Sequence, residues 1–302
     1  MTDPGWKYGK VVQPVTTSVE GHEAAVSARM RDRVFWLLRR YTSLFYIERE
    51  SFLLSKVIEG LKGEAGRASD PFEIRWFMNV LGGLYRYEAS YEKGIALLQI
   101  GDPRGYPMIV EAAKASEYLQ SRIFYDEDDN YRWMALGKPE DRPLVGILAW
   151  GRRAFTMMRN TLMTLRAEWT YDRFQEPSLA ERDDVFPPQL AVAPFPAPGA
   201  PLCSSGDRVP IQGVWWPIDR RLGCPNYLLG HQEAPEAMST VERQDYPGLP
   251  RANGLVYERR PSRWELTWAD QRYSSGVTLD ESEYESEDIE PPKEPLRLLP
   301  FP

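Results

Sequence analysis

A long stretch without proline near the N-terminus decides the fold. Residues 20–61 are EGHEAAVSARMRDRVFWLLRRYTSLFYIERESFLLSKVIEGL. Apolar side chains recur in it every three or four residues, which is the pattern of an amphipathic helix covering a core. A single helix of this length would be about 60 Å long at 1.5 Å per residue. We therefore expect a break near residues 41–44, and Gly63 and Gly66 indicate where the stripe ends.

Further helices are expected downstream of this stretch. Asp70 followed by Pro71 predicts an N-cap with proline in the first helical position. That helix runs to about residue 100, and Gly82 and Gly83 inside it predict a kink or a close helix contact. A third helix is expected over residues 106–124 and a fourth over residues 140–174. Short connections favour an antiparallel up-and-down bundle; a helical solenoid is the alternative, although no repeat of fixed period supports it.

Charge and proline divide the 302 residues into two parts. Residues 1–177 contain 25 Lys+Arg, 24 Asp+Glu and 8 Pro, whereas residues 178–302 contain 12, 20 and 18. Proline removes a backbone donor and fixes φ, so the second part is not expected to form long helices. The net charge of −7 disfavours nucleic acid as a direct partner, because phosphate binding needs clustered positive charge. It permits a basic partner.

The second part is expected to form short strands after a linker. Residues 178–206 form the linker, and the Pro/Ala-rich composition of residues 186–201 is typical of an extended spacer. Strands are expected over residues 209–216 and 263–268. The predicted fold class is thus mainly α: a helical bundle over residues 1–177, then an irregular α+β region over residues 207–302. We expect this region to pack on the bundle through its tryptophans, Trp215, Trp216, Trp264 and Trp268.

Residues typical of catalysis or metal binding are scarce. The chain has two histidines, His22 and His231, and two cysteines, Cys203 and Cys224, in no zinc-ligand spacing. It has no G-x-S-x-G elbow and no glycine-rich phosphate loop. We therefore predict no enzyme activity, no cofactor and no metal. Whether the two cysteines ever pair stays open, although two reduced thiols are typical of a cytoplasmic protein.

Two acidic clusters and one group of tyrosines are candidates for binding a partner. Residues 126–129 are four consecutive acids, and residues 280–290 contain seven acids and no base. Such runs usually form a solvated turn or tail, but they also steer positively charged partners. Tyr85, Tyr87 and Tyr91 suggest an exposed aromatic face, a frequent feature of interfaces. The predicted contact residues are Asp126, Glu127, Asp128, Asp129, Asp280, Glu281, Glu283, Glu285, Tyr87 and Tyr91.

The N-terminal residues lack the apolar segment of a secretory signal, and no apolar run approaches about 18 residues. We expect a cytoplasmic protein without membrane contact. Its oligomeric state is not indicated by the sequence.

Three stretches of the second part resemble a known group of proteins. They are VPIQGVWWP at residues 209–217, GCPNYLLG at 223–230 and RWELTWADQRY at 263–273. In this order, after a long helical region, they resemble bacterial polymorphic-toxin immunity proteins of the immunity protein 72 family and the related immunity protein 71 family. The resemblance spans residues 209–283.

The resemblance implies a protein that neutralises a cognate secreted toxin by stoichiometric occlusion. Such toxins belong to type VI or similar contact-dependent secretion systems used in bacterial competition. A basic, nuclease-like toxin acting in the cytoplasm would suit the acidic second part. Two alternatives stay open. An adaptor or chaperone that loads an effector onto a secretion machine would release active cargo, and an enzyme reversing the toxin's modification would act substoichiometrically.

Overall fold

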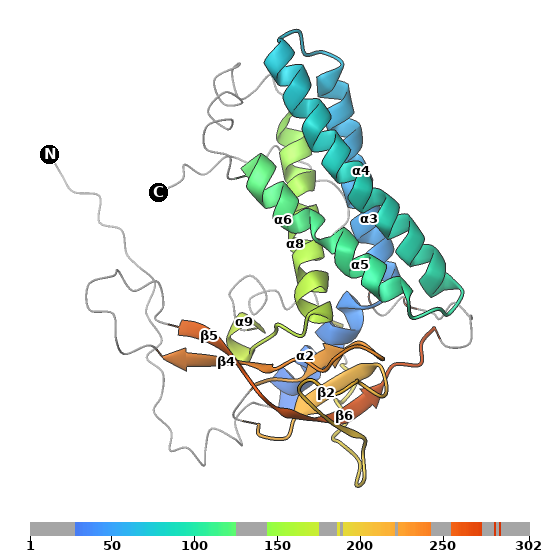
Figure 1. The fold of residues 1–302 in the computed structure, drawn as a ribbon, viewed down its shortest axis with the longest axis vertical. Helices are drawn as coiled ribbons and strands as arrows, with labels where there is room; N and C mark the ends of the chain where they lie inside the picture. Colours follow the sequence, from blue (N-terminus) through green and yellow to red (C-terminus); the bar gives the residue numbers. More distant parts are fainter. Residues whose placement is uncertain are drawn as a thin grey trace, which may run out of the picture.

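Helices in the first part of the chain are followed by small antiparallel sheets, as predicted (Figure 1). The computed structural model describes residues 28–124, 144–174, 186–187, 190–220, 223–242, 255–273, 281 and 284. The helices are α2 (Ala28–Tyr41), α3 (Leu44–Ala65), α4 (Pro71–Gln99), α5 (Gly105–Ala113), α6 (Ala115–Leu119), a π-helical turn η1 (Gln120–Phe124), α8 (Leu144–Leu165) and α9 (Tyr171–Phe174).

The long helices pack side by side around one apolar core. Helix α3 contacts both α4 and α8, and so does α5. Figure 1 shows α3, α4 and α8 running together away from the sheets, with α2 lying beside the sheets at the base. Buried aliphatic side chains of α3, such as Leu53, Leu54 and Val57, fill the interface at helical spacing. Each contributes on the order of 1.5–3 kcal/mol when fully buried.

Several local predictions are confirmed. The expected break separates α2 from α3 at Thr42 and Ser43. The Asp70 carboxylate accepts from the Phe72 N–H (2.8 Å) and caps α4, with Pro71 in the first turn. Gly83 marks a close helix contact, because a Cβ there would lie 2.4 Å from the ring of Tyr118.

The third and fourth helices differ from the prediction. The third is divided into α5, α6 and the π-helical turn, and its first two segments meet at Lys114. The fourth was expected to reach residue 174, but α8 ends at Leu165. Ala167 adopts a left-handed conformation (φ 52°). The Glu168 N–H then donates to the Met163 carbonyl (2.9 Å), which closes the helix in a Schellman-type cap.

The second part contains two antiparallel sheets. Strands β1 (Leu202–Ser204), β6 (Arg263–Ala269), β2 (Gly213–Pro217) and β3 (Asn226–Leu228) form a four-stranded sheet in that order. Strands β4 (Ala237–Glu242) and β5 (Leu255–Arg260) form a separate two-stranded ribbon. Strand β1 therefore lies within residues 178–206, which were predicted to be linker.

The four-stranded sheet has two buried faces, because its side chains alternate. Val214 and Tyr227 join the core of the helices, whereas their neighbours Trp215 and Leu228 join a smaller core on the opposite face. A bulge shifts the β2–β6 register at Val214/Trp215, and an extra residue in one strand reverses which face later side chains occupy. Gly213 (φ 152°) allows this close pairing, since a Cβ there would lie 2.0 Å from the Trp268 carbonyl oxygen.

The prediction that four tryptophans pack on the helices is wrong for Trp215 and Trp264. Trp268 does pack on them, with its ring edge-on to Phe35 of α2 at 5.8 Å. Trp215 and Trp264 instead fill the smaller core, and their indole N–H groups donate to carbonyls of nearby loops. Trp216 stacks on Phe195 at 6.4 Å.

The proline-rich segment contacts α2. Residues 190–201 contain no regular helix or strand. The Ala193 N–H donates to the Asp32 carboxylate (2.8 Å), and the ring of Phe186 packs on Trp36 at 5.3 Å. Within the residues that the structure describes, no helix combines the length and apolarity that crossing a membrane requires.

We predict that Trp264→Ala lowers the free energy of unfolding by about 3–5 kcal/mol, because the ring is fully buried and its removal leaves a cavity. Chemical denaturation monitored by circular dichroism measures this loss. Leu202→Ala on the neighbouring strand is the control, since Leu202 is half exposed. Equal stability of wild type and Trp264→Ala would show that the smaller core contributes nothing to folding.

Candidate functional site

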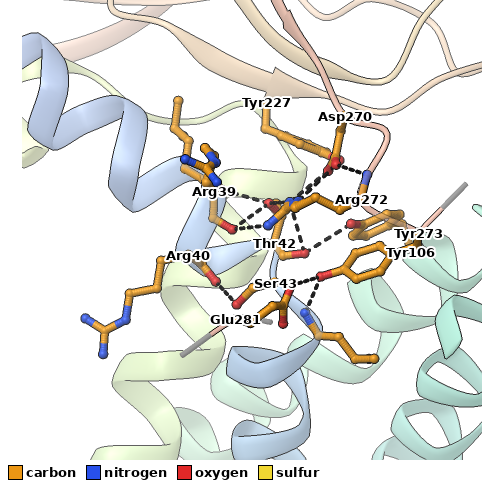
Figure 2. A network of polar contacts seen from close by, with 12 residues as sticks. Arg39, Arg40, Thr42, Ser43, Tyr106, Tyr227, Asp270, Arg272, Tyr273 and Glu281 are labelled. Atoms are coloured by element: carbon orange, nitrogen blue, oxygen red, sulfur yellow. Dashed lines mark hydrogen bonds and ion pairs between the residues drawn. The ribbon is translucent and has the colours of Figure 1, made fainter. Parts of the chain in front are cut away.

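The break between α2 and α3 is the point where distant parts of the chain meet (Figure 2). Thr42 and Ser43 are fully buried, so the carbonyls that end α2 need partners within the protein. The Arg39 carbonyl accepts from Arg272 Nη1 (2.8 Å), and the Thr42 carbonyl accepts from the Tyr106 hydroxyl (3.0 Å). These donors come from the end of the sheet and from α5.

The first two amides of α3 donate to side chains that follow the last strand of the sheet. The Leu44 N–H donates to the Tyr273 hydroxyl (2.6 Å), and the Phe45 N–H donates to Glu281 Oε2 (2.7 Å). Tyr273 in turn donates to the other oxygen of Glu281. Only the next amide, that of Tyr46, is capped locally by the Ser43 hydroxyl (3.2 Å).

We call the α2–α3 break, together with the side chains of Tyr106, Arg272, Tyr273 and Glu281 that bind it, the joint. A buried ion pair stabilises it. Asp270 and Arg272 lie 2.7 Å apart, and their side chains are 1% and 6% exposed. Arg272 also donates to the Thr42 hydroxyl (2.7 Å), and the Tyr227 hydroxyl donates to Asp270 Oδ2 (2.6 Å). Burial alone would raise the pKa of Asp270, but the adjacent Arg272 guanidinium outweighs it and holds the pKa of that carboxyl below its usual value.

The charges at the joint match the dipoles of the two helices. The carbonyl end of α2 carries partial negative charge and receives the Arg272 guanidinium. The amide end of α3 carries partial positive charge and receives the Glu281 carboxylate. The joint therefore stabilises both helix ends at once, and its polar groups are engaged with each other.

A second joint lies at the end of α8. The Asn226 side chain accepts from the Trp169 N–H (3.0 Å) and donates to the Trp169 carbonyl (3.1 Å). The Trp169 ring stacks on Phe174 at 4.3 Å. The Asn226 side chain, in the GCPNYLLG stretch, thus pairs with both backbone groups of Trp169, as a neighbouring strand would.

A buried carboxyl between α3, α4 and α8 escaped the sequence analysis. Glu50 is fully buried and accepts from the Tyr91 hydroxyl (2.8 Å). The Thr161 hydroxyl lies 2.6 Å from Glu50 and 3.0 Å from the Tyr41 carbonyl. A hydroxyl donates only one proton, so if Thr161 donates to Tyr41, the proton in its contact with Glu50 must belong to Glu50.

Burial raises the pKa of Glu50 from about 4.5 to about 8. Within the described part of the chain it forms no ion pair. The signal in the sequence was its spacing: Glu50 follows Ile47 by three residues and precedes Leu54 by four, so it occupies a core position of the helix.

The predicted acidic contact residues are mostly not described. Asp126, Glu127, Asp128, Asp129, Asp280, Glu283 and Glu285 lie outside the described residues. Glu281 is described, and it caps α3. Its carboxylate is therefore engaged within the chain.

The tyrosines differ in exposure. Tyr91 was predicted on an exposed aromatic face, and this is wrong, because it is fully buried against Glu50. Tyr87 is half-buried and packs on Tyr118 at 5.7 Å. Tyr85 is 40% exposed on the outer side of α4.

A cavity of about 490 Å³ lies between α5, the end of α8 and the sheet. Its charged groups include Arg166 and Arg259, which pair with Glu117 and Glu168 at 2.9 Å each. Its other walls combine apolar side chains, such as Val110 and Leu229, with the polar side chains of Gln232 and Glu233. The cavity therefore offers a mixed surface, and both of its arginines are paired with carboxylates of the same chain.

Both cysteines are buried free thiols, and burial raises the pKa of Cys203 to about 11. No group of three or more His, Cys, Asp or Glu side chains arranged to hold a metal ion occurs among the described residues.

Comparison with known proteins identifies no relative: no family model matches the chain, and neither a curated protein nor a solved structure is significantly similar to it.

We predict that Arg272→Met lowers the free energy of unfolding by about 3–5 kcal/mol, because it leaves Asp270 buried without its counter-ion. Combining it with Asp270→Asn should recover part of the loss, which a double-mutant cycle in urea measures. Arg104→Met is the matched control, because the Arg104–Asp102 pair is exposed and little change is expected. A loss no larger than that of the control would contradict the anchoring role.

We predict that stability falls as pH rises from about 5 to about 8. The unfolded chain releases the Glu50 proton near pH 4.5, whereas the folded chain holds it until about pH 8. The folded state therefore binds more protons in this window, and the free energy of unfolding decreases with pH. Glu50→Gln should flatten this slope in urea unfolding between pH 5 and 8, whereas exposed Glu59→Gln should leave it unchanged. An identical slope in Glu50→Gln and wild type would refute the assignment.

Proposed function

We propose that this chain is an immunity protein that binds a cognate secreted bacterial toxin in the cytoplasm and neutralises it by stoichiometric occlusion. One observation carries the proposal. Polar side chains of two of the three stretches that resemble immunity proteins, residues 223–230 and 263–273, join the sheet to the helices. Asn226 holds the end of α8, and Asp270, Arg272 and Tyr273 hold the α2–α3 break.

This use of polar residues suits a binding scaffold. A protein that inhibits by occlusion needs a rigid shape, because ordering a mobile surface on binding costs affinity. The joint supplies rigidity at the point where the two parts of the chain meet. Recognition is then left to surface side chains.

The test is a titration of the toxin domain encoded beside this chain's reading frame. We expect its activity to disappear at an equimolar ratio, with an affinity of about −12 kcal/mol or tighter, in the nanomolar range or below. Loss of activity at a substoichiometric ratio would support an enzyme, and a bound but active toxin would support an adaptor. Full toxin activity at tenfold excess of this chain would refute the proposal.

The acidic clusters provide a second test. If they steer a basic toxin, association should slow as salt rises, because the Debye length shrinks to about 8 Å at physiological ionic strength. One variant neutralises residues 126–129, and another neutralises the acids of residues 280–290 except Glu281, which must stay because it caps α3. We expect one variant to slow association at low salt in stopped-flow measurements while its unfolding stays unchanged. Equal rates for both variants and wild type would exclude steering by these clusters.

A further inference from the structure

Helix α4 carries an apolar stripe on its outer side. Ile74, Met78 and Tyr85 are 40%, 63% and 40% exposed, and Gly82 lies between the last two. Their spacings of four, four and three residues place them on one side of the helix. The side turned toward the neighbouring helices buries Val80 and Leu84 among others. Figure 1 shows α4 along the outer edge of the helical part.

The shape of the stripe would allow another helix to pack against it. A Cβ built on Gly82 would meet no atom within 4 Å, so the backbone is open to close approach there. Exposed Met78 on one side of this gap and Tyr85 on the other are large side chains of the kind that anchor interfaces. Apolar side chains at such spacing normally lie against another element.

Positive charge borders the stripe. Between residues 74 and 87 helix α4 contains no acid, and its only charged residues are Arg75 and Arg86. Both are exposed, and within the described ranges neither forms an ion pair. On the α3 side, the Lys62 ammonium lies 6.0 Å from the centroid of the Tyr85 ring, but Glu88 balances its charge, so the positive charge that borders the stripe is that of Arg75 and Arg86. An occupant with acidic side chains at its flanks would therefore be attracted.

The same charges disfavour a second copy of this chain as the occupant. Two antiparallel α4 helices would match best with Met78 of each copy over Gly82 of the other. That register brings Arg75 of one copy opposite Arg86 of the other. Like charges opposed across a helix pair are destabilising.

We propose that the stripe of Ile74, Met78, Gly82 and Tyr85 binds an amphipathic helix of a partner protein, whose acidic side chains pair with Arg75 and Arg86. Helix recognition of this kind uses apolar anchors at spacings of three and four residues. The inference goes beyond the proposed immunity function and does not depend on it. The stripe shares no residue with the acidic clusters expected to steer a toxin.

The test is a display library of 18-residue amphipathic helices whose flanking positions are randomised among Glu, Gln and Lys. Selected on the full chain, binders should be enriched in Glu. Met78→Glu should weaken them at least tenfold, and the pair Arg75→Gln and Arg86→Gln about three- to tenfold. Val192→Glu is the control, because Val192 is 74% exposed outside α4, and it should leave binding unchanged.

Fluorescence anisotropy measures the affinities, and thermal unfolding should show that Met78→Glu leaves the fold intact, since its side chain points mostly to solvent. Enrichment of Lys, binders that tolerate Met78→Glu, or a library without binders would overturn the inference. So would a wild-type dimer in light scattering that Met78→Glu dissociates, because the occupant would then be a second copy.

Discussion

The structure depends on the capping of a buried helix break. Where α2 ends and α3 begins, Thr42, Ser43 and Leu44 are buried, and an unpaired buried backbone group costs about 1–3 kcal/mol. The Leu44 and Phe45 amides have acceptors, and the Thr42 hydroxyl has a donor, more than 220 positions away in the sequence, whereas the Thr42 carbonyl accepts from Tyr106 of α5. The helices therefore cannot place this break in the core without the C-terminal segment, and the sheet is held against α2 by the same contacts. One set of hydrogen bonds thus makes the two compositionally different parts a single packed unit.

Periodicity and capping rules predicted the helical part well, because those signals are local. The apolar stripe and the Asp70–Pro71 start are encoded in neighbouring residues, and the length of the stripe predicted the break near Thr42. Features set by distant contacts were missed. Helix α8 ends at Leu165 because Ala167 adopts a left-handed conformation, and no glycine stands there to indicate it in the sequence. The Asn226 side chain then binds the backbone of Trp169. The bulge that sends Trp264 and Trp268 to opposite faces depends on pairing with β2.

The candidate contact residues were also misjudged where distant contacts decide their role. Tyr91 has the sequence character of an interface tyrosine, but its hydroxyl serves the buried Glu50 carboxyl. Glu281 belongs by sequence to an acidic tail, but it caps α3. In both cases a side chain that could bind a partner protein is instead hydrogen-bonded to a residue far away in the sequence. Surface side chains that the fold leaves uncovered, such as Met78 and Tyr85 on α4, are then the better candidates for recognition.

Hydrogen exchange of the Leu44 and Phe45 amides tests this account most directly. As the first amides of α3 they have no acceptor within their own helix, and their acceptors are Tyr273 and Glu281. The account predicts that both exchange only through global unfolding, with the same opening free energy as the core of α3. The Phe72 amide, capped locally by exposed Asp70, should exchange far faster and is the internal control. Exchange of Leu44 and Phe45 as fast as that of Phe72 would contradict the claim that the C-terminal segment caps the break.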